Sequence, residues 1–367
     1  MTDDARNRPV LESPVLESPV LESPYRTVLK PYGHALVELA RQRPEIVCLS
    51  GDLTRQCEVD LFQAAFPDRF IHAGMAEANM IGVAGALARS GLIPFVHTFG
   101  VFATRRPFDQ IVNAVAYPHL PVRIIGFMPG VSSPGGPSHQ AIEDVALMRA
   151  LPGMTVVDVA DATETAQVVA AIADLPGPVY LRLKRGEIPV IFPDDHRLSL
   201  DHAQVLVDGR DATGLARGTT GGGATAGGGV TRGGAETVCG AVTSGEGVTR
   251  GGAETVGRGG MGVWPASTGD ARGQLQAPVA VPRSDVAVLV SGMMVAPALA
   301  AARVLRSAGI AALVLNVPVI KPLDTATVLA AAAAAQTVIT AENHSIIGGL
   351  GSAVAETLAE SALPRPL

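Results

Sequence analysis

Cysteine, aromatic residues and charge are all scarce in this chain of 367 residues. Its three cysteines, Cys48, Cys57 and Cys239, are too few for a disulfide framework and lack metal-ligand spacing, which is typical of a protein of the reducing cytoplasm. Charged residues make up 17% of the chain, and its net charge of −6 leaves no basic surface for nucleic acid. The N-terminus lacks a signal-peptide core, and the alanine-rich run 329–335 is too short to span a bilayer. We therefore expect a soluble, cytoplasmic protein.

Alanine, valine, isoleucine and leucine are abundant, and 47% of the residues are hydrophobic. A chain of this length is long enough for two domains with separate cores. Strand-like segments at 122–127 and 154–159 alternate with segments of helical periodicity at 140–151 and 162–173. This alternation predicts an α/β fold with mostly parallel sheets, and we assign 28–193 to the first domain.

Helix 162–173 carries a clear start signal. Asp161 stands at its N-cap position and Glu164 follows three residues later, which together form a capping box.

Two segments lack the α/β pattern. Residues 1–27 repeat VLESP three times, and proline at every fifth position predicts a disordered tail. Residues 209–283 are rich in glycine and contain GVTRGGAETV twice, which predicts a low-complexity insert with too little apolar surface to order itself. Strand-like segments flank this insert at 203–207 and 285–292, so we expect it to enlarge the turn between two neighbouring strands.

The α/β pattern resumes after the insert. Helical periodicity at 295–308 and 323–335 alternates with strand-like runs at 311–317 and 337–343, and a last helix is expected after Gly349. We assign 194–208 and 284–367 to a second, smaller domain.

Three stretches carry polar or aromatic residues at places where an element begins. Glu77 lies where an apolar segment changes to a helix crowded with glycine and alanine, in 69–91. Phe99 and Phe102 follow a strand, and His139 begins the segment that we expect to form helix 140–151. Each feature alone has an ordinary structural explanation: a helix-dipole carboxylate, a core pair and a structural histidine.

Together and in this order, the stretches resemble the pyrimidine-binding domain of the transketolase family. The family pattern has G-x-A-E-x-N, T-F-x-x-F ending in D-Q-I, and T-H-Q followed by E-D-x-A-x-x-R, and these correspond to 74–79, 98–111 and 138–149 here. KPLD at 321–324 and ENHSIIGGLG at 342–351 resemble the family's C-terminal domain. The resemblance implies two three-layer α/β domains and a cofactor, thiamine diphosphate.

The resemblance also implies roles for individual residues. Glu77 matches the glutamate that activates the cofactor's aminopyrimidine ring, and Phe102, with Phe99 beside it, matches the aromatic pocket for that ring. Asp52 matches an aspartate near the thiazolium ring, and His139 matches a histidine that contacts the substrate beside the reacting carbon.

Arg185 matches an arginine that grips a substrate phosphate. Other family positions differ here, since Met128 and Gln56 replace the common phosphate-binding histidine and serine, and the aspartate of D-G-x-T-H-Q is absent. Ala78 replaces a common glutamine, and the family's C-terminal domain usually continues beyond Leu367. The identity of the sugar stays open.

The G-D-G motif that holds Mg²⁺ and the diphosphate in this family is absent from the sequence. The resemblance therefore implies a partner, an N-terminal subunit that supplies this half of the site, with the two chains assembled into a heterotetramer. We predict no metal ligands in this chain itself.

The leading functional hypothesis is transfer of a two-carbon ketol unit from a ketose, phosphorylated or not, to an aldehyde. The β subunit of a 2-oxo acid dehydrogenase, a fragment like 1-deoxyxylulose-phosphate synthase and a non-catalytic interaction subunit are the alternatives. His139-Gln140 and the ENHSIIGGLG stretch favour the transketolase hypothesis over the dehydrogenase.

Overall fold

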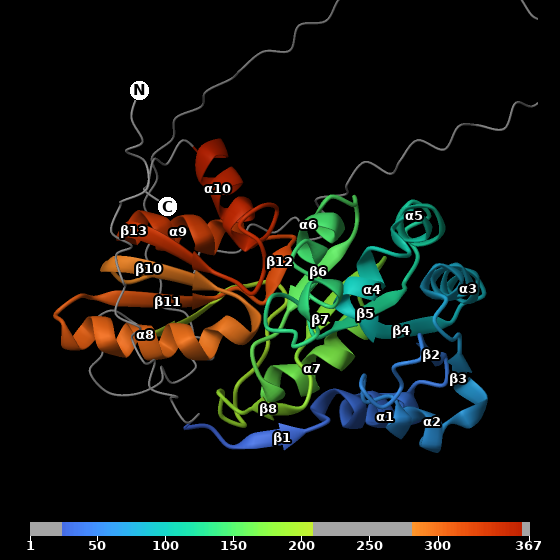
Figure 1. Ribbon diagram of the computed structural model, residues 1–367. Helices are drawn as coiled ribbons and strands as arrows, with labels where there is room; N and C mark the ends of the chain where they lie inside the picture. The colour runs from blue at the N-terminus through green and yellow to red at the C-terminus, as the bar shows by residue number, and fades with distance from the viewer. Residues whose placement is uncertain (1–23, 208–280, 362–367) are drawn as a thin grey trace, which may run out of the picture.

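The computed structural model describes residues 24–207 and 281–361. Most of the predicted tail, 1–23, and almost all of the predicted glycine-rich insert lie outside these residues, whereas Thr27, the last residue assigned to the tail, begins a strand. Within them, two α/β units lie side by side, each with a sheet between two layers of helices (Figure 1). The expected fold class is confirmed.

The first unit contains a seven-stranded sheet in the order β12-β6-β7-β5-β4-β2-β3. Six of its strands run parallel, and most of their residues are fully buried, as expected for a sheet covered on both faces. These strands are β2 (Ile46–Ser50), β3 (Phe70–His72), β4 (Ile93–Phe99), β5 (Arg123–Phe127), β6 (Thr155–Asp158) and β7 (Val179–Leu183).

Helices cover both faces of this sheet. One face packs against α1 (Pro31–Gln42), α2 (Asp60–Ala65) and α7 (Ala162–Ala173). The other face packs against α3 (Glu77–Arg89), α4 (Gly100–Thr104), α5 (Phe108–Gln110), the π-helical turn η2 (Ile111–Ala116) and α6 (Asp144–Arg149). Short 3₁₀ turns, η1 (Pro67–Arg69) and η3 (Gly136–Ser138), lie in the connections.

The second unit contains a four-stranded sheet in the order β13-β10-β11-β9. Helix α8 packs on one face, while α9 and α10 pack on the other. The elements are β9 (Gln204–Val207), β10 (Ser284–Val290), η4 (Gly292–Met294), α8 (Val295–Ser307), β11 (Ala312–Asn316), α9 (Thr325–Ala334), β13 (Ala335–Ala341) and α10 (Leu350–Glu360). A separate ribbon pairs β1 (Thr27–Leu29) with β8 (Glu187–Pro189).

The expected adjacency of the two strands that flank the insert is wrong. Strand β11 lies between β9 and β10, pairing antiparallel with β9 and parallel with β10. The sequence pattern located both strands, but strand order in a sheet depends on non-local pairing that no local signal encodes.

The expected elements agree with the structure to different degrees. Helix α7 has the expected bounds, 162–173, and the side chain of Asp161 accepts a hydrogen bond from the Glu164 N–H at 2.8 Å. The carboxylate of Glu164 accepts the N–H of Ala160, not that of Asp161, so the capping box is displaced by one residue. Helix α6 begins at Asp144, four residues later than expected.

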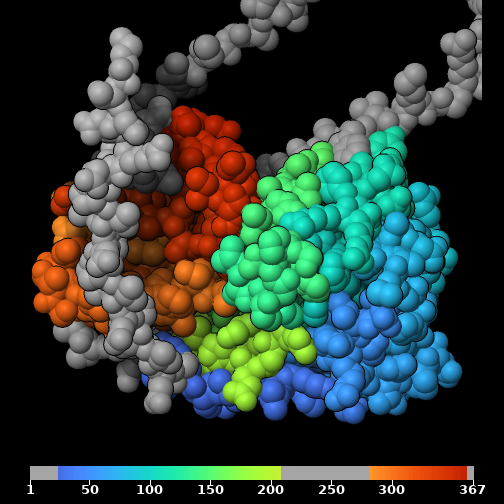
Figure 2. Space-filling model, in the orientation of Figure 1, coloured from blue at the N-terminus to red at the C-terminus, as the bar shows by residue number. Residues whose placement is uncertain are grey.

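The two units are joined by a strand and by side chains. Strand β12 (Val319–Lys321) comes from the second half of the sequence but pairs antiparallel with β6 at the edge of the first sheet. Arg149 on α6 donates to the carbonyl of Gly348 at 2.8 Å and pairs with Glu356 on α10 at 2.7 Å. Figure 2 shows the surface of the C-terminal segments in close contact with that of the middle of the chain. Among the described residues, no helix is long and apolar enough to span a membrane.

Candidate functional site

Most of the predicted site residues follow the carboxyl ends of parallel strands in the first sheet. Asp52 follows β2, Glu77 follows β3, Phe99 ends β4 and Arg185 follows β7. The chain runs from β2 to its outer neighbour β3 but from β4 to β5 on the opposite side. Ligands of open α/β sheets bind at such a change in direction, outside the carboxyl ends of the strands.

Glu77 is the first residue of α3, and only 3% of its surface is exposed. The side chain of Arg106 donates to its carboxylate at 2.7 Å. The positive end of the helix dipole and this guanidinium both stabilise a negative charge at this position. The structure thus holds a buried carboxylate at the start of α3, paired with one arginine.

The rings of Phe99 and Phe102 are nearly parallel, with centroids 6.1 Å apart and planes inclined by 20°. Phe99 ends the buried strand β4, whereas Phe102 lies one turn later on α4. The guanidinium of Arg106 lies 4.0 Å from the centre of the Phe102 ring, so one arginine contacts both this ring and Glu77. The carboxylate and the aromatic face are therefore close enough to contact a single small ring.

His139 lies against the same aromatic pair. Its ring centroid is 5.3 Å from that of Phe102 and 6.2 Å from that of Phe99, and its plane is inclined to theirs by 70° and 62°. The expectation that His139 begins a helix is wrong, because it ends the short turn η3 and helix α6 starts five residues later. The side chain of Gln140 bonds the loop that precedes it, and that of Glu143 binds Arg105. The chain does not form a helix over these residues.

Asp52 follows β2 in a left-handed conformation, with φ of 71°. Its carboxylate lies 3.3 Å from Nε2 of His72, the last residue of β3, and both side chains are about half exposed. Asp52 thus lies just beyond the carboxyl end of β2, with its carboxylate partly exposed to solvent.

Arg185 lines a cavity of about 230 Å³ together with Lys30, Arg55 and Gln56. Three of these four side chains are cationic, and Lys30 also pairs with Asp60 at 2.6 Å. Met128 lies beside this cavity, with its sulfur 3.8 Å from Nη1 of Arg185. Arg185 thus contacts Met128 and shares a cavity with Gln56, and this cavity adds two cations, Lys30 and Arg55, that the sequence argument did not single out.

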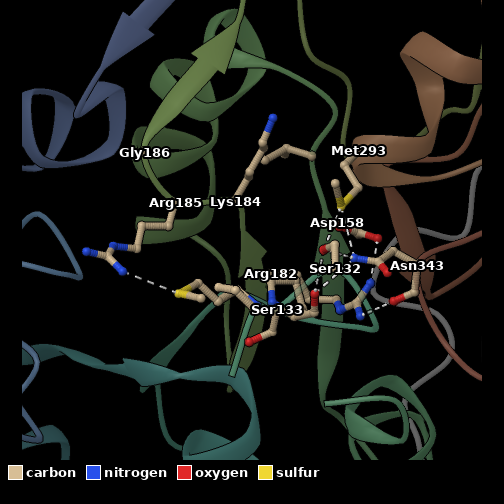
Figure 3. A pocket seen from close by; sticks show the side chains of 13 residues that line it. Ser132, Ser133, Asp158, Arg182, Lys184, Arg185, Gly186, Met293 and Asn343 are labelled. Carbon is tan, nitrogen blue, oxygen red and sulfur yellow. Dashed lines mark hydrogen bonds and ion pairs between the residues drawn. The ribbon is translucent and has the colours of Figure 1, made fainter. Parts of the chain in front are cut away.

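A second cavity, of about 370 Å³, lies between the two units. Its walls include the loop after β5, the ends of β6 and β7, and Met293 and Asn343 from the second unit. Figure 3 shows Asn343 directed toward Ser132, Met293 and Arg182 at one end of this cavity.

Beneath this second cavity lies a buried ionic network. Arg182 is 1% exposed and bonds to Asp144 at 2.8 Å and to Asp158 at 2.9 Å. Burial raises the pKa of Asp158, although Arg182 opposes this effect, while the two carboxylates keep the pKa of Arg182 above its usual value despite its burial.

Sequence reasoning did not find Arg106, Asn343 or the Arg182 network. Arg106 pairs with a residue 29 positions away, and Asn343 contacts a loop more than 200 positions earlier. Only the tandem arginines after Phe102 and the ENHSIIGG stretch gave a local signal. In residues 24–207 and 281–361, no group of three or more His, Cys, Asp or Glu residues is placed to hold a metal ion.

Two family models match the chain. Residues 26–190 match the pyrimidine-binding domain of transketolase, and residues 275–367 match the transketolase C-terminal domain. The first match contains every predicted site residue, and it implies dependence on thiamine diphosphate.

Similar proteins cover nearly the whole chain. A transketolase family protein of Sinorhizobium fredii is 38% identical over 92% of this chain and 76% of its own length. A putative transketolase C-terminal section of Methanocaldococcus jannaschii is 31% identical over 94% and 85%, and a 6-deoxy-6-sulfo-D-fructose transketolase subunit of Clostridium sp. is 35% identical over 92% and 81%. A synthase of 1-deoxy-D-xylulose 5-phosphate from Synechococcus sp. is more distant, with 29% identity over 41% of its length.

The fold matches a solved structure described as a split-gene transketolase in the form of an inactive β4 tetramer. The TM-score is 0.67 at 35% identity, over 93% of this chain and 88% of that one. The chain belongs to the transketolase family and corresponds to the C-terminal subunit of its split-gene members.

Proposed function

We propose that this chain is the cofactor-activating subunit of a thiamine diphosphate-dependent enzyme that transfers a two-carbon ketol unit from a ketose to an aldehyde. The observation that carries the proposal is the buried carboxylate of Glu77 beside the Phe99–Phe102 pair, with His139 against the same rings. A carboxylate and an aromatic face are the two contacts that an aminopyrimidine ring needs.

The described residues fit the pyrimidine half of this cofactor. Glu77 would hold the ring through its carboxylate, and Phe102 would stack against it with a gain of roughly 0.5–1.5 kcal/mol beyond area burial. When bound, thiamine diphosphate supplies the carbon nucleophile for the transfer. Asp52 at the end of β2 would lie on the thiazolium side, and His139 would hold or move a proton at a substrate oxygen.

The diphosphate half of the cofactor would come from a second polypeptide. The sequence has no G-D-G motif, and the described residues contain no group of acidic or histidine side chains suited to Mg²⁺. We propose an N-terminal subunit as the partner and source of the Mg²⁺ site, in a heterotetrameric assembly in the cytoplasm. The split-gene relative described as inactive in a β4 tetramer supports this dependence.

The cationic cavity supports a substrate with an anionic end. Lys30, Arg55 and Arg185 line it, and guanidinium groups bind phosphate or sulfonate oxygens through paired N–H donors. One relative is named for a sulfonated fructose and another, from Phocaeicola vulgatus, for apulose 4-phosphate. We propose an acidic sugar of this chemical class, with Arg185 as its main ligand.

Binding of thiamine diphosphate by calorimetry, with and without the partner, tests the proposal. The diphosphate makes several charge-assisted hydrogen bonds worth about 1.5–3 kcal/mol each, so affinity should rise about 100-fold or more when the G-D-G subunit is added. Turnover of a ketose and an aldehyde should appear only in the mixture. Tight binding by this chain alone, or a mixture that binds the cofactor without any ketol transfer, would contradict it.

A further inference from the structure

The loop that carries His139 is held by a residue of the other unit. Asn343 follows β13, is 5% exposed, and directs its carboxamide at the loop after β5. Its Nδ2 donates to the carbonyl of Pro129 and to the hydroxyl of Ser132, both at 2.9 Å, and its Oδ1 accepts the N–H of Val131 at 3.0 Å. One side chain thus both donates and accepts hydrogen bonds along a single loop, residues 129–132, and Figure 3 shows its contact with Ser132.

The anchor itself is rigid. The backbone carbonyl of Asn343 accepts a hydrogen bond at 2.9 Å from Arg182, which two buried aspartates hold in turn. Ser291 of the second unit donates to Asp158 at 3.1 Å in the same network. Buried charges that are fully hydrogen-bonded fix their neighbours strongly, because any displacement leaves a charge unpaired.

The loop is shaped to receive this carboxamide. Gly130 has φ of +75°, and a Cβ atom there would lie 2.2–2.3 Å from atoms of Asn343. Any residue other than glycine would therefore collide with the anchor and strain the backbone.

The held segment continues directly to His139. Gly130 donates to the carbonyl of Ala141 at 2.8 Å, and the side chain of Gln140 donates to the carbonyl of Val131 at 2.9 Å. One residue further along, Ser345 donates to the carbonyl of Ile142 at 3.0 Å. The residues directly after His139 are thus held by the loop that Asn343 anchors and by Ser345.

We propose that Asn343 is a positioning residue, through which the C-terminal unit sets the place of His139 against the Phe99–Phe102 pair. The catalytic meaning of this inference rests on the function proposed above, while the mechanical coupling between Asn343 and the His139 loop does not. Asn343 touches neither Glu77 nor the aromatic rings, so it acts on the substrate step and leaves cofactor binding unchanged.

Hydrogen–deuterium exchange in the full chain tests the coupling by itself. Asn343→Ala should speed exchange of the amides in 130–141 at least tenfold and leave β2 and β4 unchanged. Gln336→Ala is the matched control, since this carboxamide is exposed on β13, the strand that precedes Asn343, and bonds Asp285 at 3.2 Å. Unchanged exchange in 130–141 would overturn the proposal. If Asn343→Ala does not fold, Ser132→Ala tests the same coupling, because it removes one of the contacts from the side of the loop.

A double-mutant cycle in the reconstituted enzyme tests the catalytic role. Asn343→Ala should lower kcat/KM about 10- to 100-fold, as displacement of a positioned group does, and change cofactor affinity less than twofold. In a His139→Ala background the same substitution should have little further effect, because its target is gone. Additive losses, or a parallel loss of cofactor affinity, would overturn the proposal. A reconstituted wild type that binds no cofactor would instead refute the proposed function while leaving the exchange result intact.

Discussion

Burial displaces the pKa values of two side chains near the start of α1. Glu58 accepts the N–H of Gly33 at 3.0 Å, yet desolvation raises its pKa to about 7. His97 bonds Tyr32 at 2.7 Å and the carbonyl of Leu49 at 2.9 Å, and burial lowers its pKa to about 4. His97 is therefore neutral at pH 7, while Glu58 titrates close to that pH.

Glu58 gives the protein a predictable dependence of stability on pH. Between about pH 4.5 and 7 the folded chain binds more protons at this carboxyl than the unfolded chain, so its contribution is complete below pH 4.5 and is lost as pH rises through 7. A pKa shift of this size corresponds to about 3 kcal/mol in the free energy of unfolding. Glu58→Gln should remove this loss, as measured by urea unfolding at pH 5 and pH 8.

His97 contributes to stability with the opposite pH dependence, since its contribution is lost as pH falls from 6.5 to about 4. This contribution is present in both wild type and Glu58→Gln, so it cancels when the two proteins are compared. If wild type and Glu58→Gln lose stability equally between pH 5 and pH 8, the assignment to Glu58 is wrong.

At the residue scale, the sequence singled out individual side chains but not the partners that they contact. The family pattern located Glu77, Phe99, Phe102 and His139, and the structure brings the two rings and the imidazole together. Arg106 was missed, because its pairing with Glu77 depends on how α3 packs against the segment that follows α4 and not on any local spacing.

At the element scale, predictions succeeded where local physics decides. Helix α7 has both a cap and an apolar stripe, and its bounds were predicted correctly. Helix α6 was predicted too long, because Gln140 bonds the preceding loop and Glu143 binds Arg105. The order of β9, β11 and β10 was wrong, because β9 returns antiparallel to the edge of the sheet.

The cap of α7 also ties this helix to the connection after β8. The carboxylate of Asp161 accepts the N–H groups of Glu164, Ile191 and Phe192, each at 2.8 Å. Asp161→Ala should destabilise the protein by about 2–4 kcal/mol, because it removes a cap and leaves buried donors unpaired. Chemical denaturation measures the loss, and Asp68→Ala in the exposed turn η1 is the control. A loss below 1 kcal/mol for Asp161→Ala would show that water replaces these bonds.

At the scale of the whole molecule, the second sheet predicts that the long connection between β9 and β10 can be shortened. Val207 lies opposite Val314 in the middle of β11, and Ser284 lies on the other side of β11, four residues before Val288, the residue that pairs with Val314 there. Val207 and Ser284 are therefore separated by two strand spacings across the sheet and by four residues along the strands, which corresponds to a distance of roughly 16 Å. Residues 208–211 and 281–283 alone would reach about 25 Å when extended, which is enough to close the gap.

Deletion of 212–280 should therefore leave the melting temperature within a few degrees of wild type and the cofactor affinity of the reconstituted complex unchanged. Val281 is retained because it packs against the core of the second unit. Aggregation of the deletion variant, or a large fall in its melting temperature, would assign the segment a structural role.

The central claim is that one carboxylate of this chain activates a cofactor that another chain anchors. Exchange of the thiazolium proton of thiamine diphosphate with deuterated water, followed by NMR in the reconstituted complex, measures that activation directly. Glu77→Gln should slow this exchange by about 10²- to 10⁴-fold, as removal of a general acid–base group does, while Glu38→Gln on the exposed face of α1 should not. Exchange at the wild-type rate in Glu77→Gln, with the cofactor fully bound, would contradict the account.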